Sequence, residues 1–185
     1  MVWTATTDEP PSYCPRCGET LSSDPDVATR RNCPACGHRS YETPSPMARA
    51  TVVDGDRALL IEMGEGADAG AWALPGGHVD AREHPRDAAT RELREETGSA
   101  VAPKDLSLVG TGCVVLASGH SFVSINFAAS RGVADGELRA ADDAADARFW
   151  SFDEIRDRAS EGSRGFLRAS GVEQIARAID VVGVD

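Results

Sequence analysis

The sequence predicts an α/β domain with a mixed sheet and helices on both sides, preceded by a small metal-bound domain. Beyond residue 46, strand-like and helical segments alternate without the regular strand–helix–strand repeat of a doubly wound sheet. Four of the five cysteines fall within the first 45 residues. Pro44 and Pro46 follow them and disfavour a continuous strand ladder between the two regions. We therefore expect one domain at residues 1–45 and a second at residues 46–185.

The early cysteines form two pairs with the spacing of a four-cysteine zinc site: Cys14, Cys17, Cys33 and Cys36. Each pair encloses two residues and is followed by a glycine that frees the backbone to turn. Two disulfides are the alternative, but the N-terminus shows no secretory signal and a reducing cytosol disfavours them. Because four protein ligands leave no open position, we expect a structural Zn²⁺ that holds a small zinc ribbon folded.

The second domain is expected to open with a strand pair and to carry a helix after a glycine-rich turn. Pro85 suits the first position of this helix, and Gly98 suits the left-handed position just past its end. Cys113 lies in an apolar, strand-like run, so we expect its thiol to be buried in the core. The expected elements are strands at 47–54 and 57–63, a short strand at 71–75, a helix at 85–97, strands at 106–117 and 121–129, a strand at 147–150, and helices that start at 151 and 171.

The chain is strongly acidic, with a formal net charge of −11 and Lys104 as its single lysine. Such a surface argues against nucleic acid and anionic membranes as partners, and no apolar run is long enough to span a bilayer. Since the N-terminus carries no secretory signal, we expect a cytoplasmic protein. The acid-rich, lysine-poor composition resembles proteins of salt-accumulating halophiles, and an ordinary acidic cytosolic protein is the alternative.

Three carboxylates fall on one face of the predicted helix at 85–97: Glu92, Glu95 and Glu96. Like charges at this spacing destabilise a helix by roughly 0.2–0.5 kcal/mol per pair. The simplest interpretation is a solvated helix laced with ion pairs such as Arg91–Glu95. The residues upstream change this interpretation, because Gly77 and Glu83 precede the three carboxylates at characteristic distances.

The stretch "WALPGGHVDAREHPRDAATRELREETG" resembles, position by position, the signature of the Nudix hydrolases. The match runs from Gly77 through Glu83 and the "RELREE" segment to Gly98. It departs from the family at Ser99, where an apolar residue is preferred, and at His84, where a serine or threonine helix cap is common. The resemblance implies a Nudix α/β/α sandwich with a mixed sheet, here preceded by a zinc ribbon.

The resemblance further implies hydrolysis of a nucleoside diphosphate linked to another moiety, with water attacking a phosphorus of the diphosphate. Divalent cations, Mg²⁺ or Mn²⁺, bridge carboxylates and phosphate oxygens in this family, in agreement with the preference of Mg²⁺ for oxygen ligands. By position, the resemblance assigns Glu92, Glu95 and Glu96 to catalysis and metal binding, with Glu92 also a candidate base. The Gly77 carbonyl is expected to join the coordination.

The same resemblance assigns support of the loop to Glu83 and Arg91. In this family a further metal-binding acid often lies just before the late strand, where Asp146 matches best and Asp143 is the alternative. A solvated acidic loop is an equally valid interpretation of that region. Three residues are weaker candidates for contacts with the substrate, against a surface or packing role: His78, His120 and Phe122.

A zinc ribbon before such a domain resembles the NADH pyrophosphatases and their relatives, which include ADP-ribose pyrophosphatases. The motif that marks NADH-cleaving members is absent after the signature, so the sequence leaves open ADP-ribose, an NADH-like molecule or a related nucleotide. The alternative function is a non-catalytic protein that senses nucleotides or uses the ribbon for binding or regulation. Many family members are dimers, so a homodimer is also considered.

Overall fold

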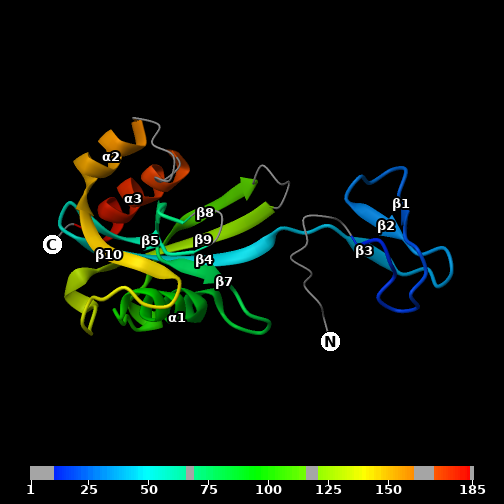
Figure 1. Ribbon diagram of the computed structural model, residues 1–185, viewed down its shortest axis with the longest axis horizontal. Helices are drawn as coiled ribbons and strands as arrows, with labels where there is room; N and C mark the ends of the chain where they lie inside the picture. Colours follow the sequence, from blue (N-terminus) through cyan, green and yellow to red (C-terminus); the bar gives the residue numbers. More distant parts are fainter. Residues whose placement is uncertain (1–10, 66–68, 116–120, 161–168, 184–185) are drawn as a thin grey trace. The chain divides into compact units, whose positions relative to one another are not determined.

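The computed structural model describes residues 11–65, 69–115, 121–160 and 169–183 (Figure 1). The chain divides into two compact units. The first, called the ribbon unit below, comprises Met1–Ser45 with Cys113–Phe122. The second, called the large unit, comprises Pro46–Gly112 with Val123–Asp185. Each unit is described by itself.

The ribbon unit contains a three-stranded antiparallel sheet in the order β1 (Ser22–Ser23), β2 (Arg30–Asn32) and β3 (Arg39–Tyr41). Hydrogen bonds from Asn32, from two backbone amides and from Arg30 outweigh the effect of burial and lower the pKa of Asp24 to about 2. Among the described residues of the unit, the apolar cluster consists of three: Cys14, Leu21 and Cys33. So small a core cannot by itself offset the chain entropy lost on folding.

The large unit is built on one seven-stranded sheet, in agreement with the predicted mixed sheet. Its central path runs in the order β10-β5-β4-β9-β8, while β6 pairs with β5 and β7 with β4. The predicted first hairpin is present, with Val53 opposite Ala58 and Gly55 in a left-handed turn (φ 63°). The strands are β4 (Ser45–Asp54), β5 (Arg57–Met63), β6 (Trp72–Ala73), β7 (Gly76–His78), β8 (Ser107–Val115), β9 (Ser121–Ser130) and β10 (Ala144–Ser151).

Helices cover both faces of this sheet, as predicted (Figure 1). Helix α1 (Pro85–Thr97) lies on one face, and α2 (Phe152–Ser160) and α3 (Ala169–Val182) lie on the other. Two short 3-10 helices, η1 (Pro103–Asp105) and η2 (Arg131–Val133), belong to the connections. None of the described helices is long and apolar enough to cross a membrane.

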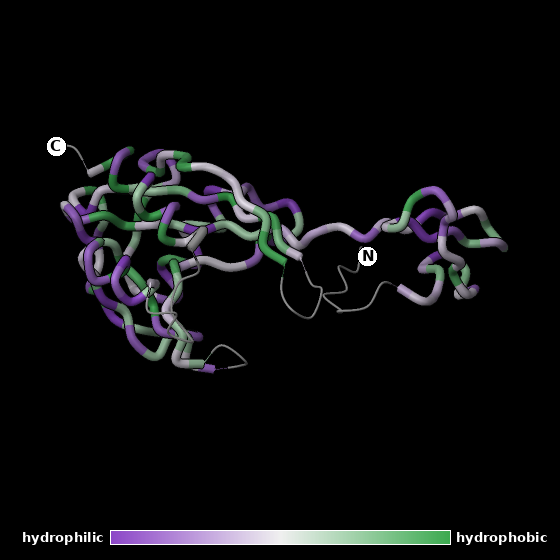
Figure 2. Tube along the Cα trace, turned by 90° about the horizontal axis from the view of Figure 1, so that it is seen from above, coloured by the Kyte–Doolittle hydropathy of each residue, from purple (hydrophilic) through white to green (hydrophobic). Residues whose placement is uncertain are grey.

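Two large apolar clusters pack on opposite sides of the sheet. The cluster beneath α1 includes Leu93 of the helix together with Val52 and Phe127 of the sheet. The cluster beneath α2 and α3 includes Ile155 and Ile175 of the helices and the strand residue Trp150, whose ring meets that of Trp72 edge-on at 4.9 Å. Hydrophobic segments accordingly recur along the strands and helices of this unit (Figure 2). The core therefore fixes the sheet between two helical layers.

One packing prediction is wrong: Cys113 is exposed rather than buried. It lies on β8, at one end of the strand order, where exposed positions recur along the strand. An apolar run on an edge strand looks the same in sequence as a run in a central strand, so hydropathy alone placed this thiol in the core.

Candidate active site

The glycine loop sits directly against helix α1. Strand β7 pairs with β4, so that Gly76 lies opposite Arg49 and Gly77 opposite Ala48. A side chain on Gly76 would bring its Cβ within 2.4 Å of the Ala48 carbonyl oxygen, and one on Gly77 would reach 2.6 Å from the Glu92 carboxyl carbon. Gly76 therefore requires glycine, because the backbone of β4 leaves no room there for a methyl group, whereas a side chain at Gly77 would displace the Glu92 carboxylate.

Helix α1 has the predicted bounds and ends. Pro85 occupies its first turn, and Gly98 adopts a left-handed conformation (φ 68°) that directs its N–H to the carbonyl of Arg94. The His84 imidazole, at a position where a serine or threonine cap is common, accepts a hydrogen bond through Nδ1 from the Arg86 N–H at 3.2 Å. A ring nitrogen thus performs the capping role of the more usual hydroxyl.

Glu96 is the most buried of the three predicted carboxylates, at 6% exposure. One of its oxygens, Oε2, accepts a hydrogen bond from the Gly76 N–H at 2.8 Å. Burial, and after it the neighbouring charges of Glu92, Asp143 and Asp142, raises the pKa of Glu96 to about 8 against the effect of that hydrogen bond. The hydrogen bond from the Gly76 N–H thus fixes the orientation of this carboxyl group.

Arg91 ties the loop to the helix through Glu83. Its Nε donates to Glu83 Oε1 at 2.9 Å and its Nη2 to Glu83 Oε2 at 3.0 Å, a bidentate arrangement. Nη2 also reaches the His78 carbonyl at 3.1 Å, and the Asp80 N–H donates to Glu83. The Arg91 guanidinium accordingly lowers the pKa of Glu83.

Arg91 also contacts two of the three predicted metal ligands. Its Nη1 lies 2.7 Å from Glu92 Oε1 and 3.1 Å from Glu95 Oε2. The ion pair with Glu95 is the one that the solvated-helix interpretation anticipates. Ion pairing and the predicted carboxylate stripe thus coexist on one helix, and Arg91 supplies part of the positive charge that the crowded carboxylates require.

The carboxylates form an open stripe rather than a closed cluster. Among the described residues, the four early cysteines are the only group of three or more potential metal ligands that lie close together, with their sulfurs all within 4.8 Å of one another. Glu95 is the most open of the three glutamates, its side chain 41% exposed. The donor set of hard carboxylate oxygens suits Mg²⁺ or Mn²⁺, which usually keep several waters and take further ligands from substrate phosphates. The residues present therefore fit a divalent cation.

A loop that the sequence did not single out holds the end of the helix. The Arg139 and Ala141 N–H groups donate to the carbonyls of Thr97 and Glu96, at 2.9 and 3.0 Å. Gly136 (φ 90°) packs against Gly98 so closely that an added Cβ would lie 2.4 Å from the Gly98 carbonyl oxygen. These bonds satisfy carbonyls that a helix end otherwise leaves unpaired. The only sequence signal is the glycine itself, which does not reveal its partner.

The same loop brings acids from outside the signature toward Glu96. Asp142 has a left-handed backbone (φ 52°), and the Asp143 carbonyl accepts from the Gly64 N–H at 2.7 Å. Both aspartates act electrostatically on Glu96. Asp146, the first choice from sequence, lies on β10, where its Oδ1 accepts from the N–H of the next residue at 2.8 Å.

The structure describes two of the three weaker substrate candidates. The His78 side chain is exposed, next to the glycines of β7. Phe122 is half-buried on β9. His120 lies outside the described residues.

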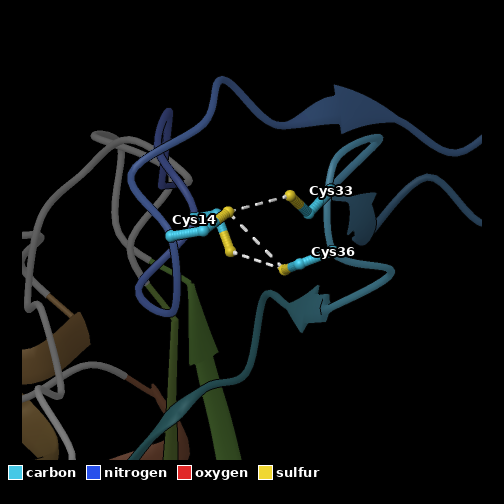
Figure 3. Close-up of side chains that lie close together, drawn as sticks. Cys14, Cys33 and Cys36 are labelled. Carbon is cyan, nitrogen blue, oxygen red and sulfur yellow. Dashed lines mark hydrogen bonds between the residues drawn. The ribbon is translucent and has the colours of Figure 1, made fainter.

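The four ribbon cysteines converge as their spacing predicts (Figure 3). Sulfur–sulfur distances of 3.5–3.6 Å join Cys14 to Cys36, Cys17 to Cys33 and Cys17 to Cys36. These distances exclude disulfides, whose sulfurs are about 2.05 Å apart. They approach the edge of about 3.8 Å expected for a tetrahedron with zinc–sulfur bonds of about 2.3 Å. The thiols therefore fit a structural zinc ion.

Comparison with known proteins places this site in a family. The model of the NUDIX domain matches residues 44–169. The chain is 35% identical over 124 residues to the ADP-ribose pyrophosphatase of Methanocaldococcus jannaschii, covering 64% of this chain and 68% of that protein. It is 31% identical over 99 residues to the NAD-capped RNA hydrolase NudC of Pseudomonas aeruginosa, covering 54% of this chain and 34% of that protein. The crystal structure of a MutT NUDIX hydrolase from Burkholderia pseudomallei superposes with a TM-score of 0.61 at 25% identity, covering 74% of this chain and 98% of that one.

The sheet, its two helical layers and the loop–helix site define a domain of the Nudix class. The chain belongs to the Nudix family. The predicted fold and the predicted class of enzyme, a Nudix pyrophosphatase, are thereby confirmed. The chain spans only about a third of the length of the NudC relative, so the activity of that whole protein is not transferred here.

Proposed function

We propose that this protein hydrolyses a nucleoside diphosphate linked to a second moiety in a reaction that depends on Mg²⁺ or Mn²⁺. The observation that carries the proposal is the joint placement of the glycine loop and the glutamate stripe. The Gly76 N–H holds Glu96, the Gly77 backbone lies against the Glu92 carboxylate, and Arg91 links Glu92 to Glu83. A solvated surface helix does not require such close approach between a loop and its carboxylates.

The cation would be held by Glu92, Glu95 and Glu96 with the Gly77 carbonyl, and when bound it supplies positive charge to the diphosphate and lowers the pKa of a bound water. The chain itself orients these oxygens. In the reaction, the oxygen of water forms a bond to one phosphorus while the bond from that phosphorus to the bridging oxygen breaks. Glu92 is the proposed base that accepts the proton of the water.

We assign the additional acid to Asp143 rather than to Asp146. Asp143 belongs to the loop that bonds the Glu96 carbonyl, and its charge acts on the Glu96 carboxyl. Asp146 instead engages the backbone of its own strand. Reduced metal-dependent turnover in Asp143→Asn with unchanged turnover in Asp146→Asn supports this assignment, and the reverse pattern overturns it.

We propose ADP-ribose or an NADH-like nucleotide as the substrate. Support comes from relatives named as an ADP-ribose pyrophosphatase and an NAD-capped RNA hydrolase. The ribbon is proposed to bind structural zinc and to take no part in the chemistry, since its four thiolates leave no open position.

A panel of ADP-ribose, NADH and NAD⁺, each with Mg²⁺, with Mn²⁺ and with excess chelator, tests the proposal. AMP with ribose 5-phosphate identifies ADP-ribose as the substrate, and AMP with reduced nicotinamide mononucleotide identifies NADH. Turnover that persists in chelator contradicts the metal dependence. Binding of these nucleotides without any cleavage favours the alternative, a nucleotide sensor.

A further inference from the structure

The loop between η2 and β10 runs back along the C-terminal end of helix α1 (Figure 1). Asp135 and Ala100 exchange two backbone hydrogen bonds of 2.9 Å, just beyond the helix. Further on, N–H groups of the loop donate to the carbonyls of Thr97 and then Glu96 in the last turn of the helix. The place of this loop on the helix is therefore set by main-chain groups at several successive points.

The loop ends in a tight turn that carries two aspartates. The Ala144 N–H donates to the Ala141 carbonyl at 3.1 Å, so Asp142 and Asp143 are the two central residues of this turn. The N–H of Ala141 itself donates to the Glu96 carbonyl at 3.0 Å. The turn, called the acid turn below, is thus attached directly to the backbone of a proposed catalytic glutamate.

The acid turn is held at a second point by the end of strand β5. The Asp143 carbonyl accepts a hydrogen bond of 2.7 Å from the N–H of Gly64, which directly follows the strand. A Cβ on Gly64 would lie 3.0 Å from that carbonyl oxygen, closer than an ordinary contact. One end of the turn is therefore fixed to helix α1 and the other to the sheet.

Asp142, the first central residue of the acid turn, has a left-handed backbone (φ 52°). This conformation is unfavourable for residues with a Cβ, although aspartate adopts it more readily than most. Burial, and after it the charges of Glu92, Asp143 and Asp142, raises the pKa of Glu96. The turn thus keeps two carboxylates near Glu96 despite backbone strain and charge repulsion, and such strain concentrates at functional sites.

Gly136 fixes how the loop lies on the helix before the chain reaches the acid turn. Its backbone is left-handed (φ 90°), and an added Cβ would lie 2.4 Å from the Gly98 carbonyl oxygen. A Cβ on Gly98 would in turn lie 2.6 Å from the Glu137 carbonyl oxygen. Two backbones meet here without room for a side chain on either glycine. Because Gly136 stands five residues before Ala141, this contact acts on the aspartates through the backbone of the loop.

We propose that Gly136 is a positioning residue for the hydrolysis: its contact with Gly98 sets the acid turn in the place where the Asp143 carboxylate acts together with Glu96. The inference rests on the proposed function, in which Asp143 is the additional acid. It adds a determinant of turnover that lies outside the catalytic signature and has no side chain of its own. A displacement of about 1 Å in a reacting group can lower turnover by about 100-fold, so a backbone contact is sufficient for this role.

A double-mutant cycle on the full-length protein tests the role, with Mg²⁺-dependent turnover of the nucleotide that the substrate panel identifies as the readout. We expect Gly136→Ala and Asp143→Asn each to lower kcat at least about tenfold. The double variant should be no slower than Asp143→Asn, because the position of the acid is immaterial once the acid is removed. Gly132→Ala is the matched control and should keep wild-type turnover, since its added Cβ would make an ordinary contact of 3.6 Å with Ser130 Oγ.

Gly64→Ala perturbs the second attachment of the acid turn and decides the matter if Gly136→Ala does not fold. Its milder contact with the Asp143 carbonyl should lower kcat by a smaller factor, and this loss should also vanish in the Asp143→Asn background. Losses that multiply in the double variants overturn the inference, because general loosening of the fold acts with or without the acid. Wild-type turnover in a folded Gly136→Ala, or in Asp143→Asn, overturns it as well.

Binding of Mn²⁺ without nucleotide, measured by electron paramagnetic resonance, separates this inference from the proposed function. We expect Gly136→Ala and Asp143→Asn to weaken Mn²⁺ binding, and the double variant to bind no more weakly than Asp143→Asn. A wild type that cleaves no nucleotide, with variants that show this binding pattern, contradicts the proposed function alone. A wild type that cleaves nucleotide, with a Gly136→Ala variant that matches it in binding and turnover, contradicts the positioning role alone.

Discussion

The two units of this chain are stabilised in different ways. The ribbon unit has an apolar cluster of three residues, two of which are cysteines of the predicted zinc site. The large unit has a sheet with apolar clusters on both sides. In the ribbon unit the same side chains thus serve as core and as proposed metal ligands. In the large unit the two tasks are divided, even within one helix: Leu93 of α1 faces the core and Glu92 faces the glycine loop.

From this difference we expect each unit to unfold independently of the other. Loss of metal should unfold the ribbon unit. A metal site that exists only in the folded state adds the free energy of metal binding to the free energy of folding. Loss of packing should unfold the large unit, whose described apolar clusters contain no ribbon cysteine. The predictions below test this division, beginning with the largest effect.

Replacing Cys14 with serine should abolish structural zinc binding, a contribution of roughly 10 kcal/mol or more to folding of a small metal domain. Zinc content by elemental analysis should fall to zero and the ribbon should become sensitive to protease. Cys113→Ser, a matched change at an exposed thiol outside the cluster, should keep zinc. Zinc retained at full stoichiometry in Cys14→Ser would contradict the assignment.

Replacing Leu93 with alanine should destabilise the large unit by about 2–5 kcal/mol, because it leaves a cavity among fully buried residues. Urea unfolding followed by tryptophan fluorescence measures the loss, since Trp72 and Trp150 lie in that unit. Leu108→Ala is the control, as Leu108 is 55% exposed and should change stability by less than about 0.5 kcal/mol. Zinc content should be unaffected, and its loss in Leu93→Ala would argue that the units are coupled.

Replacing Glu83 with glutamine should cost about 1–3 kcal/mol at pH 7, through loss of the charged hydrogen bonds with Arg91. Arg91 lowers the pKa of Glu83 in the folded state, so this stabilisation is fully present above the unfolded pKa of about 4.3 and is lost as pH falls through the folded value. The stability difference between wild type and variant should therefore shrink below about pH 4. A difference that is constant from pH 7 to pH 3 would show that the charge is not responsible.

Much of this molecule could be predicted from local patterns. Helix α1 has its predicted bounds because Pro85 and Gly98 mark its ends. The first hairpin and the cysteine cluster likewise follow from spacing within a short stretch. Such features depend on neighbours in sequence, which periodicity and turn residues report directly.

What the sequence did not reveal depends on contacts between distant segments. Gly136 approaches Gly98, and the charge of Asp142, in the loop after it, acts on Glu96 together with that of Asp143, which the sequence offered only as the alternative acid. The domain boundary at residue 45, the halophilic source and the roles of the individual site residues stay predictions.

The most direct test of the central claim compares Glu96→Gln with Asp87→Asn, two carboxyl-to-amide changes on helix α1. Asp87 is exposed in the first turn, whereas Glu96 is buried against the Gly76 N–H, which a glutamine oxygen can still accept from. We predict that Glu96→Gln keeps the melting temperature of the wild type and loses at least about 1,000-fold in Mg²⁺-dependent turnover, about 4 kcal/mol of transition-state stabilisation. Asp87→Asn should retain wild-type turnover. Full activity in a folded Glu96→Gln would contradict the account.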